Sequence, residues 1–311
     1  MVVTLHNKVM IAKMKIIDPH IHLFNLEQGQ YFWLKAESPP FWPDKSIIHK
    51  SFNEAALTLA PAIELFGFVH IEAGFDNEKP WRELISLESS CHRPFRAISA
   101  INLTDSSENF KKHLAKLAKC QSFVGVRHIF DEQALSLLTQ NQVIENFKTL
   151  NNFAANLGNQ RLVFESQLPL FENNGVSEFC KVIKENTQIR FIINHGGFPP
   201  SDADTNEWRC WQNNLRKLSF YSHVAIKCSG WEMVERKYKQ AWINKSLTSV
   251  FNIFGVKRVM LASNFPLCLF SKSSYYEYWQ SIIKSQFFTG LSEVEKSALC
   301  YDNALHWYFI K

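Results

Sequence analysis

The chain has 311 residues, of which 46% are hydrophobic and 20% charged, and its formal net charge is +5. This length excludes a mini-protein that depends on disulfides or a structural metal, and the ordinary composition excludes disorder. The weak net charge and scattered basic residues predict no nucleic-acid partner, and no apolar stretch approaches the ~20 residues of a membrane span. Length alone allows two small domains or one α/β barrel.

The first 14 residues precede the first strand-like segment. They contain basic residues but no continuous apolar run and no small-residue cleavage site, so they match a signal peptide poorly. We expect residues 1–14 to be an N-terminal extension or a misassigned start, and residues 15–311 to form one domain. The seven cysteines are widely spaced, without a CxxC pair, which predicts free thiols and a cytoplasmic protein.

Short β-rich apolar runs alternate with segments whose apolar residues recur at helical spacing. The expected strands are residues 15–19, 67–71, 95–101, 123–127, 161–164, 190–194, 223–227 and 257–262. The expected helices include residues 53–65, 107–119, 146–156, 177–185, 208–218 and 244–254. Eight such repeats predict an α/β fold, a single (β/α)8 TIM barrel. A doubly wound sheet also alternates, but the first strand runs into DPHIHLF and not into a GxGxxG turn.

Two segments lie outside this alternation. Residues 25–51 are rich in Trp, Pro and Phe and are too long for a simple turn, so we expect a long aromatic loop that folds over the barrel mouth. Trp33 in this loop either walls a pocket or packs within the loop. Residues 292–308 predict a C-terminal helix that closes the barrel.

The ends of the expected strands carry polar residues, and catalytic groups of a barrel sit at the carboxyl ends of its strands. These residues are His20 and His22, Glu72, Arg127 and His128, Glu165 and Gln167, His195, and Asn264 after strands one, two, four, five, six and eight respectively. Residues i and i+2 of a strand point to the same side, so His20 and His22 can share one cation or one substrate oxygen. Each residue also has a purely structural interpretation. His20 and His22 could be surface histidines or histidines whose hydrogen bonds are satisfied in the core, His195 could serve only in a turn, and Arg127 could pair with a neighbouring acid.

Several motifs resemble the amidohydrolase-related (amidohydrolase 2) family of the amidohydrolase superfamily, nearest the group of sugar lactonases and pyrone-dicarboxylate lactonase. They are IIDPHIHLFNLEQGQYFWL, VHIEAGF, FVGVRHIF, INHGGFPP, IKCSGWE, FGVKRVMLASNFPLC and DNALHWY. The resemblance covers residues 15–310 and implies a TIM barrel. It matches His20 and His22 to the family's first-strand pair, His195 to its sixth-strand histidine, and Arg127, with His128 beside it, to its substrate-binding arginine.

The resemblance fails at the end of the eighth strand. The family usually reads Ser-Asp-Trp-Pro there, with the Asp as general base and potential metal ligand, whereas this chain has Asn264 followed by Phe265. A carboxamide does not take up a proton near neutral pH. Three explanations stay open: His195, Glu165 or Glu72 supplies the base, the chain is a degenerate copy, or an engineered exchange traps substrate. A fifth-strand histidine is also missing, so a binuclear centre is not expected.

The resemblance implies a hydrolase that opens a small carboxylated or sugar-derived lactone by attack of activated water. His20, His22, His195 and Asn264 form the expected catalytic set, and Arg127, His128, Glu72, Trp33, Glu165 and Gln167 form the expected substrate-binding set. His20, His22 and His195 would hold one divalent cation, zinc or manganese, if one is used, and metal-free activity is the alternative. A catalytically impaired barrel that binds a ligand or partner, and a metal-dependent decarboxylase, are the rival functions. A small molecule is the expected partner, and monomer and homodimer both stay open.

Overall fold

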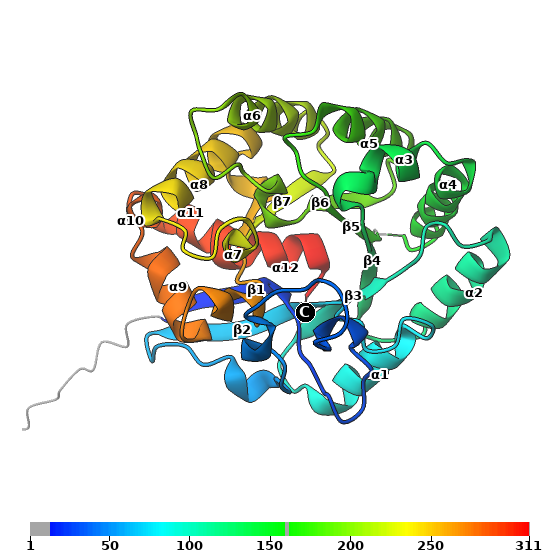
Figure 1. The fold of residues 1–311 in the computed structure, drawn as a ribbon, viewed down its shortest axis with the longest axis horizontal. Coiled ribbons are helices and arrows are strands. Elements are labelled where there is room, and N and C mark those ends of the chain that lie inside the picture. The colour runs from blue at the N-terminus through cyan, green and yellow to red at the C-terminus, as the bar shows by residue number, and fades with distance from the viewer. Residues whose placement is uncertain (1–12, 159–161, 311) are drawn as a thin grey trace, which may run out of the picture.

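The computed structural model describes residues 13–158 and 162–310. Eight parallel strands form one sheet in the order β1 to β8, and helices surround it (Figure 1). They are β1 (Met14–Ile21), β2 (Ile63–Ile71), β3 (Phe95–Ala100), β4 (Phe123–Ile129), β5 (Val163–Gln167), β6 (Arg190–Ile193), β7 (Val224–Cys228) and β8 (Val259–Leu261). The first and last strands meet where Asn264 N–H donates to the His20 carbonyl and His22 N–H to the Phe265 carbonyl. The predicted (β/α)8 TIM barrel is confirmed.

The outer layer consists of helices whose apolar faces pack on the strands. The longer ones are α1 (Trp81–Ser90), α2 (Ser107–Leu117), α4 (Asn141–Ala155), α5 (Asn173–Glu185), α6 (Asn206–Ser219), α8 (Gln240–Phe254) and α9 (Tyr275–Ile283), and the shorter ones are α3 (Ala134–Leu138) and α10 (Gln286–Thr289). The short helix α7 (Trp231–Val234) lies at the barrel mouth, where its Met233 lines the cavity there. The helices expected at 107–119, 146–156, 177–185, 208–218 and 244–254 are confirmed. No helix in the described part of the chain is both long and apolar enough to cross a membrane.

The helix expected over residues 53–65 is wrong. Only a single 3₁₀ turn, η3 (Glu54–Ala56), forms there, with Asn53 as its cap, because Asn53 Oδ1 accepts from the Ala55 amide at 3.0 Å. Pro61 cannot donate the hydrogen bond that a helix needs, and residues 63–65 instead pair with β1. The seven cysteines are free thiols, as predicted. The expected extension falls mainly on residues 1–12, and the expected start of the fifth strand on residue 161, all outside the described residues.

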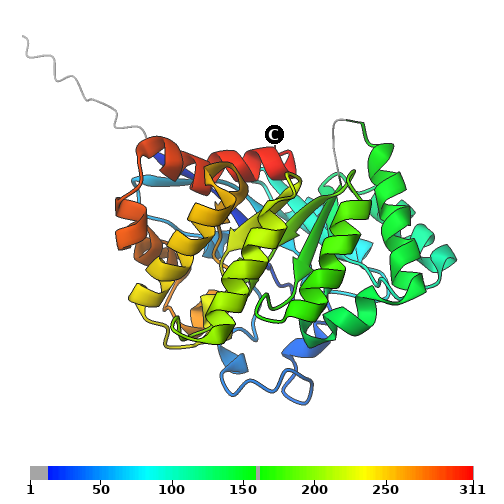
Figure 2. The ribbon, with the colours of Figure 1, turned by 90° about the horizontal axis from the view of Figure 1, so that it is seen from above.

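The C-terminal segment closes one end of the barrel. It consists of α11 (Glu293–Ser297), a π-helical turn η8 (Ala298–Asp302) and α12 (Asn303–Tyr308), and it starts at a capping box formed by Ser292 and Glu295. Trp307 and Tyr308 pack against the inward-pointing strand residues Ile17, Val69, Ile71, Ile98, Val124, Val163, Ile192, Ala225 and Met260. Figure 2 shows this segment at the end of the barrel opposite the loop after β1. The predicted closing helix is therefore confirmed.

The aromatic loop of residues 25–51 covers the other end, where the strands finish. It contains two 3₁₀ turns, η1 (Phe32–Leu34) and η2 (Lys45–Ile47). Trp33 Nε1–H donates to the Ala73 carbonyl at 2.7 Å, just after β2. Asp44 forms an ion pair with Arg236, at 2.8 Å between Oδ2 and Nε, in the segment after α7. These contacts fix the loop to two sides of the barrel mouth, as the sequence predicted.

Candidate active site

His20 and His22 stand at the carboxyl end of β1, at the floor of the barrel mouth. Their Nε2 atoms lie 3.2 Å apart and the ring centroids 5.0 Å apart. The Nδ1 of His22 lies 2.9 Å from the Ile71 carbonyl oxygen and 3.1 Å from that of Glu72. Because carbonyl oxygens only accept, Nδ1 carries the proton and the lone pair of His22 is on Nε2, facing His20. The strand alternation thus brings the two imidazoles together, as expected.

Burial keeps both of these histidines neutral. Desolvation lowers the pKa of His20 and of His22 well below the ordinary value, and the positive charges of Lys227 beside His20 and of Arg127 beside His22 act in the same direction. His20 Nδ1 has no hydrogen-bond partner among the described residues. The pair is therefore a source of lone pairs at neutral pH and not a source of positive charge.

His195 follows β6 and completes a cluster of three imidazole rings. It sits in a 3₁₀ turn, η5 (His195–Gly197), at a φ of 55°, and its ring centroid is 4.7 Å from that of His20. Its Nδ1 lies 3.1 Å from Ser229 Oγ, after β7. Gly230 has a φ of 67°, and a Cβ there would overlap the His195 ring. Burial, together with the positive charge of Arg127, lowers the pKa of His195 well below its ordinary value.

Arg127 and Glu72 form an ion pair on the β2–β4 side of the mouth. Arg127 Nη2 and Nε donate to Glu72 Oε1 at 2.5 and 2.9 Å. The exposed fractions of the two side chains are 6% and 13%. Burial raises the pKa of Glu72, and the guanidinium opposes that rise. The acid partner that the sequence left open for Arg127 is therefore present, and it neutralises the cation.

Asn264 follows β8 in the left-handed backbone region, at a φ of 59°, which Asn tolerates better than most residues. Its Nδ2–H donates to Glu232 Oε1 at 2.6 Å, while its Oδ1 has no partner among the described residues. Glu232 lies in α7 and is 1% exposed, and burial raises its pKa to about 7. The pattern of polar strand ends does not single out Glu232, although it belongs to the motif IKCSGWE and is the first acid after the seventh strand.

One cavity of about 610 Å³ brings most of the expected site residues together. The expected residues on its wall are His22, Trp33, Glu72, Arg127, Gln167, His195 and Asn264. Apolar and aromatic groups, including Trp42, Phe198, Met233 and Leu267, form most of the rest of the wall, and Asn77 and Asp131 are its further polar residues. Such a wall with a few converging polar groups is typical of small-molecule sites.

Three expected residues do not line this cavity. His20 lies behind His22 and His195 and contacts the cavity through them. His128 points away because neighbours on a strand face opposite sides, and its Nδ1 lies 3.1 Å from the Ile101 carbonyl oxygen. Glu165 is fully buried inside the barrel, where Lys227 Nζ and the Tyr308 hydroxyl donate to its two carboxylate oxygens at 2.5 and 2.6 Å. The expected substrate-binding roles of His128 and Glu165 are therefore not supported by their positions.

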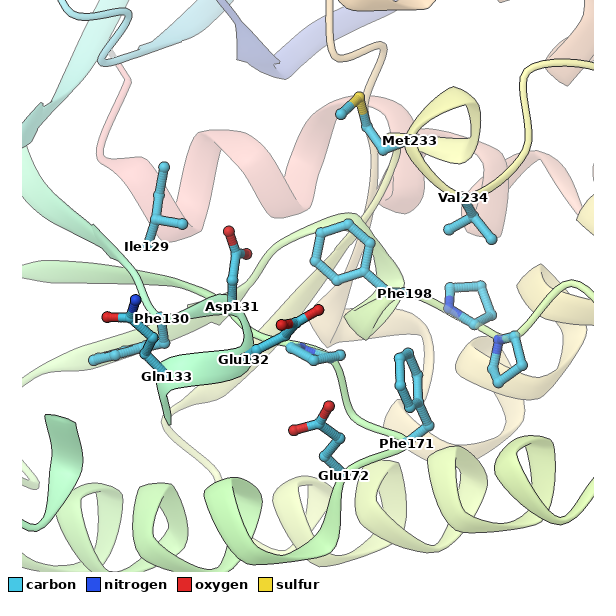
Figure 3. A pocket seen from close by; sticks show the side chains of 13 residues that line it. Ile129, Phe130, Asp131, Glu132, Gln133, Phe171, Glu172, Phe198, Met233 and Val234 are labelled. Atoms are coloured by element: carbon cyan, nitrogen blue, oxygen red, sulfur yellow. The ribbon is translucent and has the colours of Figure 1, made fainter. Parts of the chain in front are cut away.

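A second hollow of about 670 Å³ adjoins the cavity, and the two share Ile129, Asp131, Phe198 and Met233. Figure 3 shows this outer hollow, with the carboxylates of Asp131, Glu132 and Glu172 on one side and Phe198 and Phe171 on the other. No histidine or arginine lines it. The outer hollow thus extends the mouth, and the groups suited to chemistry lie in the inner cavity.

The expected cation site is incomplete. The two Nε2 atoms of His20 and His22 are close enough to share an ion, but a zinc site needs at least three protein ligands. Within residues 13–158 and 162–310, no group of three or more His, Cys, Asp or Glu side chains is arranged to hold a metal ion. His195 is turned with Nδ1 toward Ser229, and position 264 supplies a neutral amide. The residues present therefore do not form the three-histidine cation site that the sequence left open beside metal-free activity.

Comparison with known proteins places these features in a family context. The family model described as Amidohydrolase matches residues 17–310. An uncharacterized protein of Sinorhizobium fredii, y4mH, is 26% identical over 309 residues, which cover 96% of this chain and 99% of the relative. An L-fucono-1,5-lactonase of Burkholderia multivorans is 30% identical over 156 residues, 47% of this chain and 49% of the relative.

The fold also matches solved structures. The crystal structure of an amidohydrolase from Burkholderia multivorans with bound zinc has a TM-score of 0.76 and 18% sequence identity. The match covers 95% of this chain and 99% of that one. At this identity the likeness concerns the fold.

Proposed function

The chain belongs to the amidohydrolase family, and from this premise we propose that it hydrolyses a small lactone, most favourably one derived from a sugar. The observation that carries the proposal is the convergence of His22, Arg127, His195 and Asn264 on one cavity at the carboxyl ends of the strands. The partial match to an L-fucono-1,5-lactonase supports the same reaction class.

His195 is the proposed general base. A tautomer in which Nδ1–H donates to Ser229 Oγ leaves the lone pair on Nε2, and the lowered pKa keeps the ring neutral and able to accept a proton. His195 takes a proton from water while the water oxygen attacks the lactone carbonyl carbon. The imidazolium then returns that proton to the ring oxygen as the acyl–oxygen bond breaks, and a hydroxy acid forms. Of the three bases considered from the sequence, Glu72 is engaged by Arg127 and Glu165 by Lys227, so His195 is the one without an ion partner among the described residues.

Arg127 is the proposed electrophile for the carbonyl oxygen. Its ion pair with Glu72 uses Nε and Nη2, so Nη1 is the guanidinium nitrogen left to a substrate oxygen. Because Glu72 cancels the charge of Arg127 and Asp131 adds a further acid to the wall, the cavity offers no excess positive charge. A neutral, hydroxyl-rich lactone therefore suits the cavity better than a carboxylated one.

A panel of five- and six-membered sugar lactones, with carboxylated lactones beside them, tests the proposal. Wild type, His195→Ala and the matched control His92→Ala, an exposed histidine on the other end of the barrel, are assayed by acid release. We expect turnover of a neutral lactone by wild type and by the control, and a loss of at least ~100-fold in His195→Ala. Equal rates in all three proteins, or a preference for carboxylated lactones, would contradict the proposal.

The substitution at position 264 favours a second candidate, a barrel that binds a lactone or sugar acid without turning it over. Asn264 cannot accept a proton, and the described residues form no complete metal site. Calorimetry separates the two. Micromolar binding of a sugar lactone by wild type without acid release, in buffer alone and with added zinc or manganese, would identify a binding protein.

A further inference from the structure

Asn264 and Glu232 form a buried hydrogen-bonded pair. The family pattern has an acid at position 264, whereas this chain has an amide there. The donor Asn264 Nδ2 and the acceptor Glu232 Oε1 are 2.6 Å apart, and both residues are 1% exposed. Asn264 is also held through its backbone, because its N–H donates to the His20 carbonyl at 3.0 Å. The only freedom left to the side chain is therefore the choice of which amide atom faces Glu232.

We propose that Glu232 is a positioning residue, which fixes the amide of Asn264 so that Oδ1 is the atom offered to water or a substrate hydroxyl in the cavity. An ionised carboxylate only accepts hydrogen bonds, so it selects Nδ2 and turns Oδ1 away from itself. Oδ1 is a buried acceptor with no hydrogen-bond partner among the described residues, and Asn264 is one of the residues that line the cavity. This inference rests on the proposed function, since the water it orients is the one that His195 activates.

The same pair explains why an amide stands where the family has an acid. An aspartate at position 264 would place a carboxylate oxygen against Glu232 at the distance now occupied by a hydrogen bond. Two carboxylates this close cannot both ionise, and one of them must keep a proton. Asn264 avoids that conflict because its amide donates. Position 264 is thus matched to Glu232, and restoring the acid alone does not restore a free base.

Few other groups around Glu232 can bind its carboxylate in place of the Asn264 amide. Arg236, two residues beyond α7, is the nearby cation, but its Nη1 donates to the Glu232 backbone carbonyl and its Nε pairs with Asp44. Tyr238, Cys268 and Tyr278 are the other titratable groups influenced by the charge of Glu232, and burial raises the pKa of all three, so they stay neutral. Glu232 Oε2 has no hydrogen-bond partner among the described residues. The Asn264 amide is therefore the side-chain group that donates a hydrogen bond to the Glu232 carboxylate.

The first test of the inference needs no activity. Melting temperatures at pH 8 are compared for wild type, Asn264→Asp, Glu232→Gln and the double variant. We expect Asn264→Asp to lower the melting temperature by on the order of 5 °C through the uncompensated buried charge, and the double variant to recover most of it. At pH 5, where a proton is available to share, the Asn264→Asp loss should shrink. The proposed match between Asn264 and Glu232 would be overturned if Asn264→Asp lowered the melting temperature equally at both pH values and the added Glu232→Gln exchange did not recover the loss.

The second test uses lactone turnover. Glu232→Leu removes the acceptor, and we expect kcat to fall roughly tenfold to a hundredfold with KM nearly unchanged. Glu232→Gln keeps one acceptor oxygen and should lose less. Burial raises the pKa of Glu232 to about 7, so wild-type kcat should rise with pH near neutrality as the carboxylate forms, and Glu232→Gln should flatten that rise. The matched control Glu235→Gln, an exposed neighbour, should behave as wild type. If Glu232→Leu keeps wild-type kcat and pH profile, Glu232 does not position Asn264 for catalysis. If wild type itself does not hydrolyse any lactone, the proposed function fails. The melting temperatures still show whether Asn264 and Glu232 are matched.

Discussion

Two buried glutamates, Glu165 inside the barrel and Glu232 beside its mouth, differ in how their carboxyl groups are bound. Both oxygens of Glu165 are satisfied, one by the Lys227 ammonium and the other by the Tyr308 hydroxyl. Glu232 receives one side-chain hydrogen bond, from the Asn264 amide, and its second oxygen has no partner among the described residues. A fully compensated carboxylate is part of the barrel interior, whereas an incompletely compensated one beside a cavity is suited to control a neighbour. The hydrogen-bond and ion partners of the two carboxylates distinguish Glu165 from Glu232 better than their burial does.

Removing the cation that compensates Glu165 should have the largest effect. Lys227→Met leaves a carboxylate without its ion partner in the barrel interior, and we expect a loss of about 4 kcal/mol in the free energy of unfolding. The double variant Lys227→Met/Glu165→Gln should recover much of that loss. Urea unfolding followed by circular dichroism measures both. A single variant within about 1 kcal/mol of wild type would show that Glu165 and Glu232 are not distinguished in this way.

The pH dependence of stability should distinguish Glu232. Burial raises its pKa from 4.5 to about 7, so between these values the folded chain holds a proton that the unfolded chain has lost. Stability from this group therefore falls as pH rises through that window and is constant above it. Replacing Glu232 with Gln should reduce the stability lost between pH 5 and pH 8 by about 3 kcal/mol.

Urea unfolding of wild type and Glu232→Gln at both pH values provides the measurement. Asp18, whose pKa burial raises to about 6, contributes with the same sign in both proteins and cancels in the comparison. Identical pH dependence in the two proteins would mean that Glu232 is as well compensated as Glu165.

A smaller effect should follow from removing one hydrogen bond to Glu165. Tyr308→Phe deletes the hydroxyl that donates to Oε1 at 2.6 Å, and we expect a loss of about 2 kcal/mol in the free energy of unfolding. Tyr301→Phe, at a partly buried tyrosine of the same C-terminal segment, serves as the control. If the two variants lose equal stability, the Tyr308 hydrogen bond does not compensate the buried carboxylate.

Gly230 links the α7 segment to the proposed base. An alanine there meets the His195 ring and requires a backbone that side chains rarely adopt, so we expect a stability loss of about 1–2 kcal/mol with a larger loss of kcat. Gly255→Ala tests the backbone cost alone, because Gly255 also has a positive φ but nothing lies near its would-be Cβ. Equal kcat in the two variants would argue against contact between this segment and a working His195.

Much of the fold follows from patterns that are local in the sequence. Alternating apolar runs and helical segments predict the barrel, and the HxH spacing correctly places His20 and His22 side by side. The helix expected over residues 53–65 fails because its apolar spacing is local, while the pairing of β2 with β1 that overrides it is not. The observed strands also begin or end a few residues away from the expected positions, because the hydrogen bonds to neighbouring strands set where each strand begins and ends.

The site depends on features that strand ends do not encode. Arg127 and His128 are adjacent, yet only one faces the cavity, and the sequence does not say which. Glu165 follows an expected strand just as Glu72 does, but it lies in the middle of β5 and its side chain reaches Lys227 inside the barrel. Glu232 comes after the strand, in a turn whose course is set by Gly230. Tertiary contacts between distant segments decide all three cases.

The central claim is that the cavity hydrolyses a neutral lactone with His195 as the base. The most direct measurement is the initial rate of acid release from a neutral sugar lactone, corrected for spontaneous hydrolysis, for wild type and His195→Ala. The account predicts a rate well above background for wild type and a rate at least ~100-fold lower for His195→Ala. Wild type without turnover on any lactone, or His195→Ala as fast as wild type, would contradict it.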